Sequence, residues 1–169
     1  MGSLNANGCF DIGKDMLDKL QNTFWSMRCS EEDCATTIKS VFEYSRKTRI
    51  IDPHTAVAVF AAKQFRRAFP QDAHVPLVVA STAHWAKFPE PVLKALDPSN
   101  PALSLTHHSS SPEIVKALHH AIEELCPGEK VHGALASALA TAELSGNARA
   151  APRDENYIIE ELRRFAAAN

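Results

Sequence analysis

Residues 76–80 read Pro76-Leu77-Val78-Val79-Ala80, a continuous apolar run with no polar residue in it. The run is too short for a helix and lacks the alternation that marks a half-buried strand. A strand that is buried on both faces, as in a parallel α/β sheet, has this pattern. We therefore expect an α/β fold in which this run is a central strand that ends at the polar residues 81–84.

The rest of the chain has the pattern of a mostly helical protein. Helical spacing of apolar residues, together with capping residues, predicts most of the secondary structure. The expected helices cover residues 11–24, 31–49, 53–69, 88–96, 112–126 and 131–145, and a last one starts at Asp154. Residues 97–111 have the composition of a loop. The expected fold class is thus mostly helical α/β with one or two buried strands.

A single strand that is buried on both faces needs neighbouring strands, and this sequence offers almost none. Either another chain completes the sheet, or these residues are the carboxyl-terminal piece of something larger. In the second case the apolar faces at residues 56–62 and 77–80 are left uncovered and promote self-association.

Length, composition and charge exclude several classes of protein. The chain has 169 residues, 45% of them hydrophobic, which suits one domain and argues against intrinsic disorder. A formal net charge of −2 gives no reason to expect nucleic acid or anionic lipid as a partner. The longest apolar run, residues 56–62, is too short to span a membrane, and the amino terminus has no secretory signal, so we expect a cytoplasmic protein.

Two short segments carry residues that could do chemistry: Asp52-Pro53-His54-Thr55-Ala56-Val57 and Ser81-Thr82-Ala83-His84-Trp85-Ala86-Lys87-Phe88. The first also has a purely structural interpretation, because Asp52 is a good N-cap and Pro53 suits the first helical position. The second follows the expected strand directly. Ligands of open α/β sheets bind beyond the carboxyl ends of strands, so this segment is the stronger candidate for a site.

These two segments together resemble the carboxyl-terminal signature of threonine synthase, a fold-type II enzyme that depends on pyridoxal 5'-phosphate (PLP). The resemblance covers roughly residues 8–96 and departs from the family at Trp85, where proline is usual. It implies that residues 1–97 are the carboxyl-terminal part of the PLP domain and that residues 98–169 are a helical tail. The complete enzyme would convert O-phosphohomoserine and water to threonine and phosphate, as a lyase of threonine biosynthesis.

The resemblance assigns a cofactor role to Thr82. In such enzymes a Ser or Thr hydroxyl lies beside the pyridine nitrogen of PLP and tunes the electron-withdrawing power of the ring. Ser81 is the substitute if the register differs by one residue. For Asp52, His54, His84 and Lys87 the resemblance implies only that they belong to the motifs, with a structural or supporting role.

The lysine that forms the Schiff base in this family stands in a Ser-Phe-Lys-Asp-like context, which this sequence lacks. Lys87 sits in a different motif and is a poor substitute. A glycine-rich loop for the cofactor phosphate is also absent, since the six glycines do not cluster. We therefore expect no catalytic residue in this chain and no activity of the chain alone, because covalent catalysis through an imine needs the lysine.

Two interpretations from other classes stay open. One is a non-catalytic interaction or regulatory domain derived from the enzyme. The other is a metal-binding module that uses the pairs His107-His108 and His119-His120 with Cys126. Adjacent histidines do not easily face one ion, and the second pair should be exposed on its helix. We therefore expect no metal site, and free thiols at the four cysteines.

Overall fold

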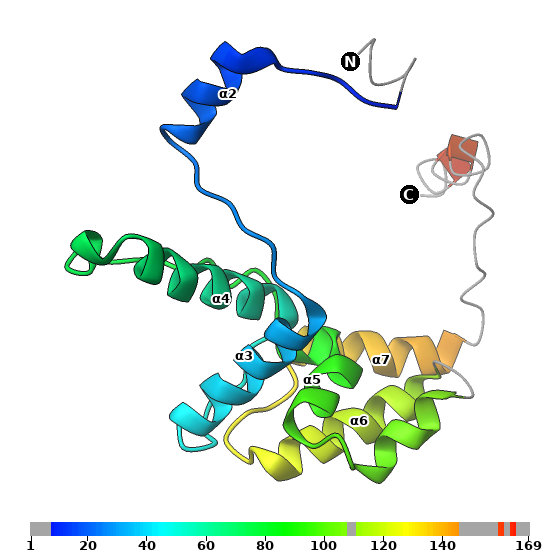
Figure 1. Ribbon diagram of the computed structural model, residues 1–169. Helices are drawn as coiled ribbons and strands as arrows, with labels where there is room; N and C mark the ends of the chain where they lie inside the picture. The colour runs from blue at the N-terminus through cyan, green and yellow to red at the C-terminus, as the bar shows by residue number, and fades with distance from the viewer. Residues whose placement is uncertain (1–7, 108–110, 146–158, 161–162, 165–169) are drawn as a thin grey trace.

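The computed structural model describes residues 8–107, 111–145, 159–160 and 163–164, and within this part it contains helices and no strand. Helices α3, α5 and α6 pack in one cluster, α4 projects from that cluster, and α2 lies apart from it (Figure 1). The elements are α2 (Gly13–Gln21), α3 (Glu31–Tyr44), α4 (Pro53–Ala68), η1 (Pro70–Asp72), η2 (Trp85–Lys87), α5 (Pro89–Leu96), η3 (Pro101–His107), α6 (Pro112–Leu125) and α7 (Gly133–Ser145). No helix in the described part is long and apolar enough to cross a membrane.

Side-chain caps start the three helices that matter most for the site, as the sequence predicts for the helix that follows Asp52. Ser30 caps α3 and forms a reciprocal capping box with Asp33. Asp52 caps α4, with Pro53 in the first turn. Ser111 caps α6, where its side chain accepts a hydrogen bond from the amide of Ile114. These starts depend on residues that are close together in the sequence.

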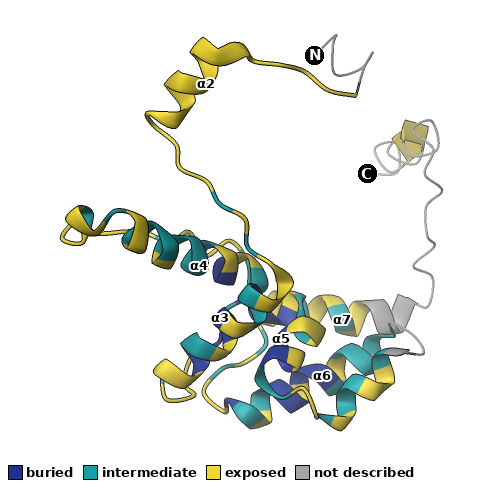
Figure 2. Cartoon of the chain, in the orientation of Figure 1, coloured by how far each residue is buried: buried dark blue, intermediate teal, exposed yellow. Residues whose placement is uncertain are grey.

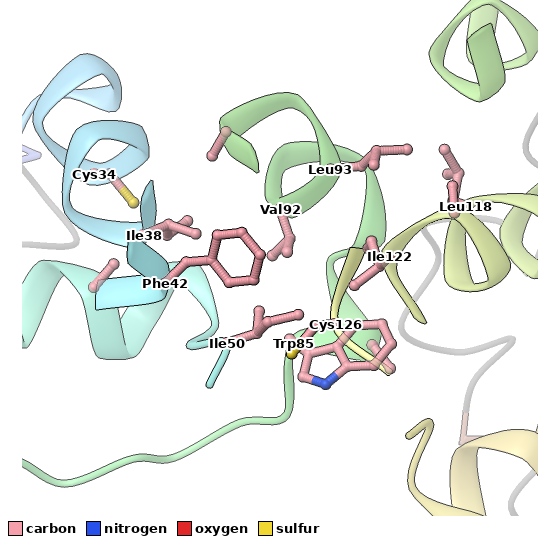
Figure 3. Close-up of a cluster of buried hydrophobic side chains, with 14 residues drawn as sticks. Cys34, Ile38, Phe42, Ile50, Trp85, Val92, Leu93, Leu118, Ile122 and Cys126 are labelled. Atoms are coloured by element: carbon pink, nitrogen blue, oxygen red, sulfur yellow. The ribbon is translucent and has the colours of Figure 1, made fainter. Parts of the chain in front are cut away.

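The hydrophobic core lies where α3, α5 and α6 meet (Figures 2 and 3). Its largest fully buried side chains are Ile38, Trp85, Val92, Leu93, Ile122 and Cys126. Residues on both sides of position 97 contribute to this one core. The part of the chain after residue 97 therefore contributes structure to the same unit through α6.

The prediction of a buried strand at residues 76–80 is wrong for this chain. The segment is irregular, and Val78 is 95% exposed while Leu77 is 43% exposed. A strand exists only when a neighbour satisfies its backbone groups, and no described residue pairs with this segment. The apolar composition is therefore present without the sheet that would bury it.

Three other expectations need correction or lie outside the described residues. The expected loop at 97–111 contains the 3-10 helix η3. The apolar part of α4 is not covered on most sides, since Val57 is 42% exposed and residues 58–62 are only half-buried (Figure 2). Most of the helix expected from Asp154 falls outside the described residues.

Candidate functional site

The amino terminus of α4 is organised around the buried carboxylate of Asp52, which is 1% exposed. One carboxylate oxygen, Oδ1, accepts hydrogen bonds from the amides of His54 (2.9 Å) and Thr55 (3.4 Å). The other oxygen, Oδ2, accepts a hydrogen bond from the Thr55 hydroxyl. The predicted N-cap is therefore confirmed, and the same carboxylate also holds a side chain one turn into the helix.

The Thr55 hydroxyl connects this cap to Ser81, the first residue of the second motif. Its Oγ1 lies 3.1 Å from Oγ of Ser81, at a distance of 26 residues along the chain. The structure thus joins Asp52, Thr55 and Ser81 in one hydrogen-bonded series. Sequence analysis did not single out Thr55, although a threonine three residues after an Asp N-cap faces back toward the cap.

Thr82, the residue to which the resemblance assigns the cofactor role, lies next to this series but is not part of it. Its side chain is exposed, and its hydroxyl has no hydrogen-bond partner among the described residues. The hydroxyl is therefore available to a ligand at the open edge of the segment.

His54 and Lys87 meet at the ring of Phe88. The Nδ1 atom of His54 lies 3.2 Å from Oδ1 of Asp52, and its ring centroid lies 4.8 Å from that of Phe88. The ammonium of Lys87 lies 5.8 Å from the Phe88 centroid. Both side chains are solvent-exposed, His54 at 61%. These contacts connect the two motifs on the side of α4 that also holds Asp52.

His84 has a structural role in the second motif. Its side chain caps η2, because Nδ1 accepts a hydrogen bond from the amide of Ala86 (3.2 Å). Burial lowers the pKa of His84 below its usual value, and the neighbouring His132 and His119 act in the same direction. A neutral ring is needed for the cap, so the lowered pKa is consistent with the geometry.

Trp85, at the position where the threonine synthase family usually has proline, is a core residue. It is 2% exposed and packs edge-on against His119, with ring centroids 5.7 Å apart. Its indole Nε1 is buried and has no partner in the described part of the structure. Trp85 therefore anchors the end of the second motif to α6.

The expectation that both members of the pair His119-His120 are exposed is wrong for His119. That side chain is 5% exposed, and its Nε2 donates to the carbonyl of Ala86 at 2.8 Å. His119 can lie on the buried side of α6 because the carbonyl of Ala86 accepts a hydrogen bond from its ring. His120 is exposed and lies 3.6 Å from Glu124.

The side chains with metal-ligating chemistry are dispersed. No group of three or more His, Cys, Asp or Glu residues that could hold a metal ion occurs among the described residues. The pair His107-His108 lies at the edge of that part, and His108 falls outside it. The four cysteines are free, and burial raises the pKa of the Cys34 and Cys126 thiols.

A pocket of the described chain lies between the start of α3 and α5, beside the α4 cap. It has a volume of about 520 Å³, and its lining is mostly apolar but includes Glu31, Glu32 and Glu90. Pro53 lines this pocket, whereas Ser81 and Thr82 do not. The hydroxyl pair therefore sits on an open surface of the chain rather than in an enclosed cavity.

Comparison with known families shows what part of this chain is similar to. Residues 55–126 match the family described as "Threonine synthase, C-terminal". The resemblance expected from the two motifs is thereby confirmed, and the match continues past residue 97 to the end of α6. Residues 55–126 are therefore similar in sequence to the carboxyl-terminal region of threonine synthases.

Individual relatives agree with this assignment. The chain is 39% identical to threonine synthase of Saccharomyces cerevisiae over 95 residues, which is 55% of this chain and 18% of the yeast protein. It is 35% identical to threonine synthase of Pseudomonas aeruginosa over 103 residues (61% and 21%) and 38% identical to human threonine synthase-like 1 over 93 residues (55% and 12%). The chain thus spans about one fifth or less of these relatives, and no solved structure matches it.

Proposed function

We propose that this chain forms the carboxyl-terminal wall of a threonine-synthase-type PLP site and that Thr82 supplies the hydroxyl next to the pyridine nitrogen. The observation that carries the proposal is the exposed Thr82 hydroxyl, which has no partner among the described residues and follows Ser81, the exposed end of a hydrogen-bonded series that begins at the buried Asp52 and Thr55. The family match at residues 55–126 supports it, because this match includes Thr82.

The residues present fit one edge of the cofactor. A neutral hydroxyl such as that of Thr82 donates a hydrogen bond to the ring nitrogen without full proton transfer, and the bound ring would serve as an electron sink. The described chain does not offer the other anchors. Lys87 is directed to the Phe88 ring, and the glycines have no clustered arrangement that would cradle a phosphate.

The complete enzyme would act on O-phosphohomoserine and release phosphate, with threonine as the product. The proton transfers of that reaction would need a Schiff-base lysine, and no lysine of these 169 residues stands in the sequence context of that residue. We therefore propose that this chain by itself has no threonine synthase activity and that its contribution is the hydroxyl and the surface around it.

A chimeric enzyme tests this proposal. Residues 30–126 of this chain replace the matching segment of the yeast threonine synthase, and threonine formation is measured. The chimera should be active, Thr82→Ser should keep most of the activity, and Thr82→Ala should lower kcat at least about tenfold, as expected for loss of a transition-state interaction. Thr36→Ala, on the exposed face of α3, is the matched control. A Thr82→Ala chimera with unchanged kcat would contradict the proposal.

A further inference from the structure

We propose that Thr55 is a positioning residue. Its hydroxyl is hydrogen-bonded to both Asp52 and Ser81, and it thereby keeps the segment that carries Thr82 in place. The inference rests on the proposed function of Thr82. It assigns a task to the buried hydroxyl of Thr55 and to the exposed hydroxyl of Ser81.

The direction of the hydrogen bonds follows from counting protons. An ionised carboxylate accepts hydrogen bonds and donates none, so the single proton of the Thr55 hydroxyl points to Oδ2 of Asp52. The contact between Thr55 and Ser81 then needs its proton from Ser81, so Ser81 is the donor at 3.1 Å. The proton of Ser81 is therefore committed to Thr55.

The assignment of these protons gives different roles to the adjacent hydroxyls of Ser81 and Thr82. A pyridine nitrogen needs a donor, and Ser81 has already used its only proton. Thr82 has no partner among the described residues and keeps its proton for a ligand. Ser81 thus holds the segment, and Thr82 faces the ligand.

The hydrogen bond from Ser81 to Thr55 matters because few other contacts fix residues 76–83. Residues 76–83 make no other hydrogen bond within the described chain. The guanidinium of Arg66 binds the carbonyl of Val75 just before the segment, and His84 caps η2 just after it. The contact between Ser81 and Thr55 is therefore the one hydrogen-bonded attachment between these two ends in the described part. Thr55 is 5% exposed and Ser81 is exposed, so the contact is shielded from water on the Thr55 side.

The experiment measures backbone order in the chain itself. Amide order parameters from nitrogen-15 relaxation are recorded for the wild type, Thr55→Ser, Thr55→Val and Ser81→Ala. In the wild type and Thr55→Ser, the amides of Ser81 and Thr82 should be rigid, with values near about 0.85. In Thr55→Val and Ser81→Ala they should fall below about 0.6, while the amides of α3 and α5 keep their values.

Thr37→Val is the matched control, because Thr37 is also a buried helical threonine (4% exposed) but lies in α3. It should leave the Thr82 amide rigid. If Thr55→Val fails to fold, Ser81→Ala decides, since it removes only the last bond of the series and leaves the α4 cap intact. An ordered Thr82 in a folded Ser81→Ala variant would overturn the inference.

The chimeric enzyme separates this inference from the proposed function. If both hold, Ser81→Ala lowers kcat in the chimera and loosens the segment in the chain, and Thr55→Ser restores both readouts relative to Thr55→Val. If Thr82→Ala leaves kcat unchanged while Ser81→Ala still loosens the segment, the proposed function of Thr82 is wrong and the positioning role of Thr55 and Ser81 is supported. If the segment stays rigid in Ser81→Ala, the positioning role is wrong, whatever value kcat has.

Discussion

Replacement of Asp52 by alanine should destabilise the protein by about 2–4 kcal/mol. Loss of an N-cap costs about 1 kcal/mol, and loss of the hydrogen bond from the buried Thr55 hydroxyl to a charged carboxylate costs about 1.5–3 kcal/mol more. Both penalties apply, because Asp52 is 1% exposed and accepts hydrogen bonds from two amides and from the Thr55 hydroxyl. Asp52→Asn should cost about 1 kcal/mol or less, since asparagine is an equally good N-cap and its side-chain amide can donate to Thr55.

Urea unfolding followed by tryptophan fluorescence and circular dichroism measures these values. The midpoint should fall with an unchanged slope, which indicates lost stability rather than a changed unfolded state. Asp15→Ala in the exposed helix α2 is the control and should change stability by less than about 0.5 kcal/mol. The reasoning is refuted if Asp52→Ala costs less than about 1 kcal/mol, or if Asp52→Asn costs as much as Asp52→Ala.

Three further predictions follow from burial and charge. Trp85→Ala should cost about 3–5 kcal/mol in the same assay, because it empties the middle of the core (2% exposed), and a loss below about 1 kcal/mol would contradict that placement. Because burial lowers the pKa of His84, the unfolded state binds the proton better, so the free energy of unfolding should fall as the pH drops below about 6.5. His84→Gln should show a smaller fall over the same pH range, and an equal fall in both proteins would contradict this prediction. Val78, at 95% exposure, should promote concentration-dependent self-association that Val78→Lys abolishes in sedimentation; a monomeric wild type at all concentrations would argue against it.

Helix starts could be predicted from the sequence because the interactions that make them are local. Ser30, Asp52 and Ser111 each cap the helix that begins at the next residue, as their residue types and neighbours indicate. The two motifs were likewise readable, since the resemblance rests on adjacent residues. The family match confirms that part of the sequence argument.

The strand could not be predicted correctly, because a strand depends on partners that local sequence does not contain. The run at residues 76–80 is apolar on both sides, yet it stays exposed when no neighbouring strand pairs with it. The burial of His119 depends in the same way on the Ala86 carbonyl, which is distant in the sequence. The link from Thr55 to Ser81 is a tertiary contact of this kind, although the position of Thr55 behind Asp52 was a usable signal.

The most direct test of the central claim observes the hydrogen bond at the cofactor's ring nitrogen. PLP labelled with nitrogen-15 in the ring is bound to the chimeric enzyme, and its chemical shift is compared among the unsubstituted protein, Thr82→Ala and Ser81→Ala. Thr82→Ala should remove the hydrogen-bond shift, and Ser81→Ala, with its loosened segment, should weaken it only in part. A shift that is lost with Ser81→Ala and unchanged with Thr82→Ala would show that Ser81, and not Thr82, donates to the ring nitrogen.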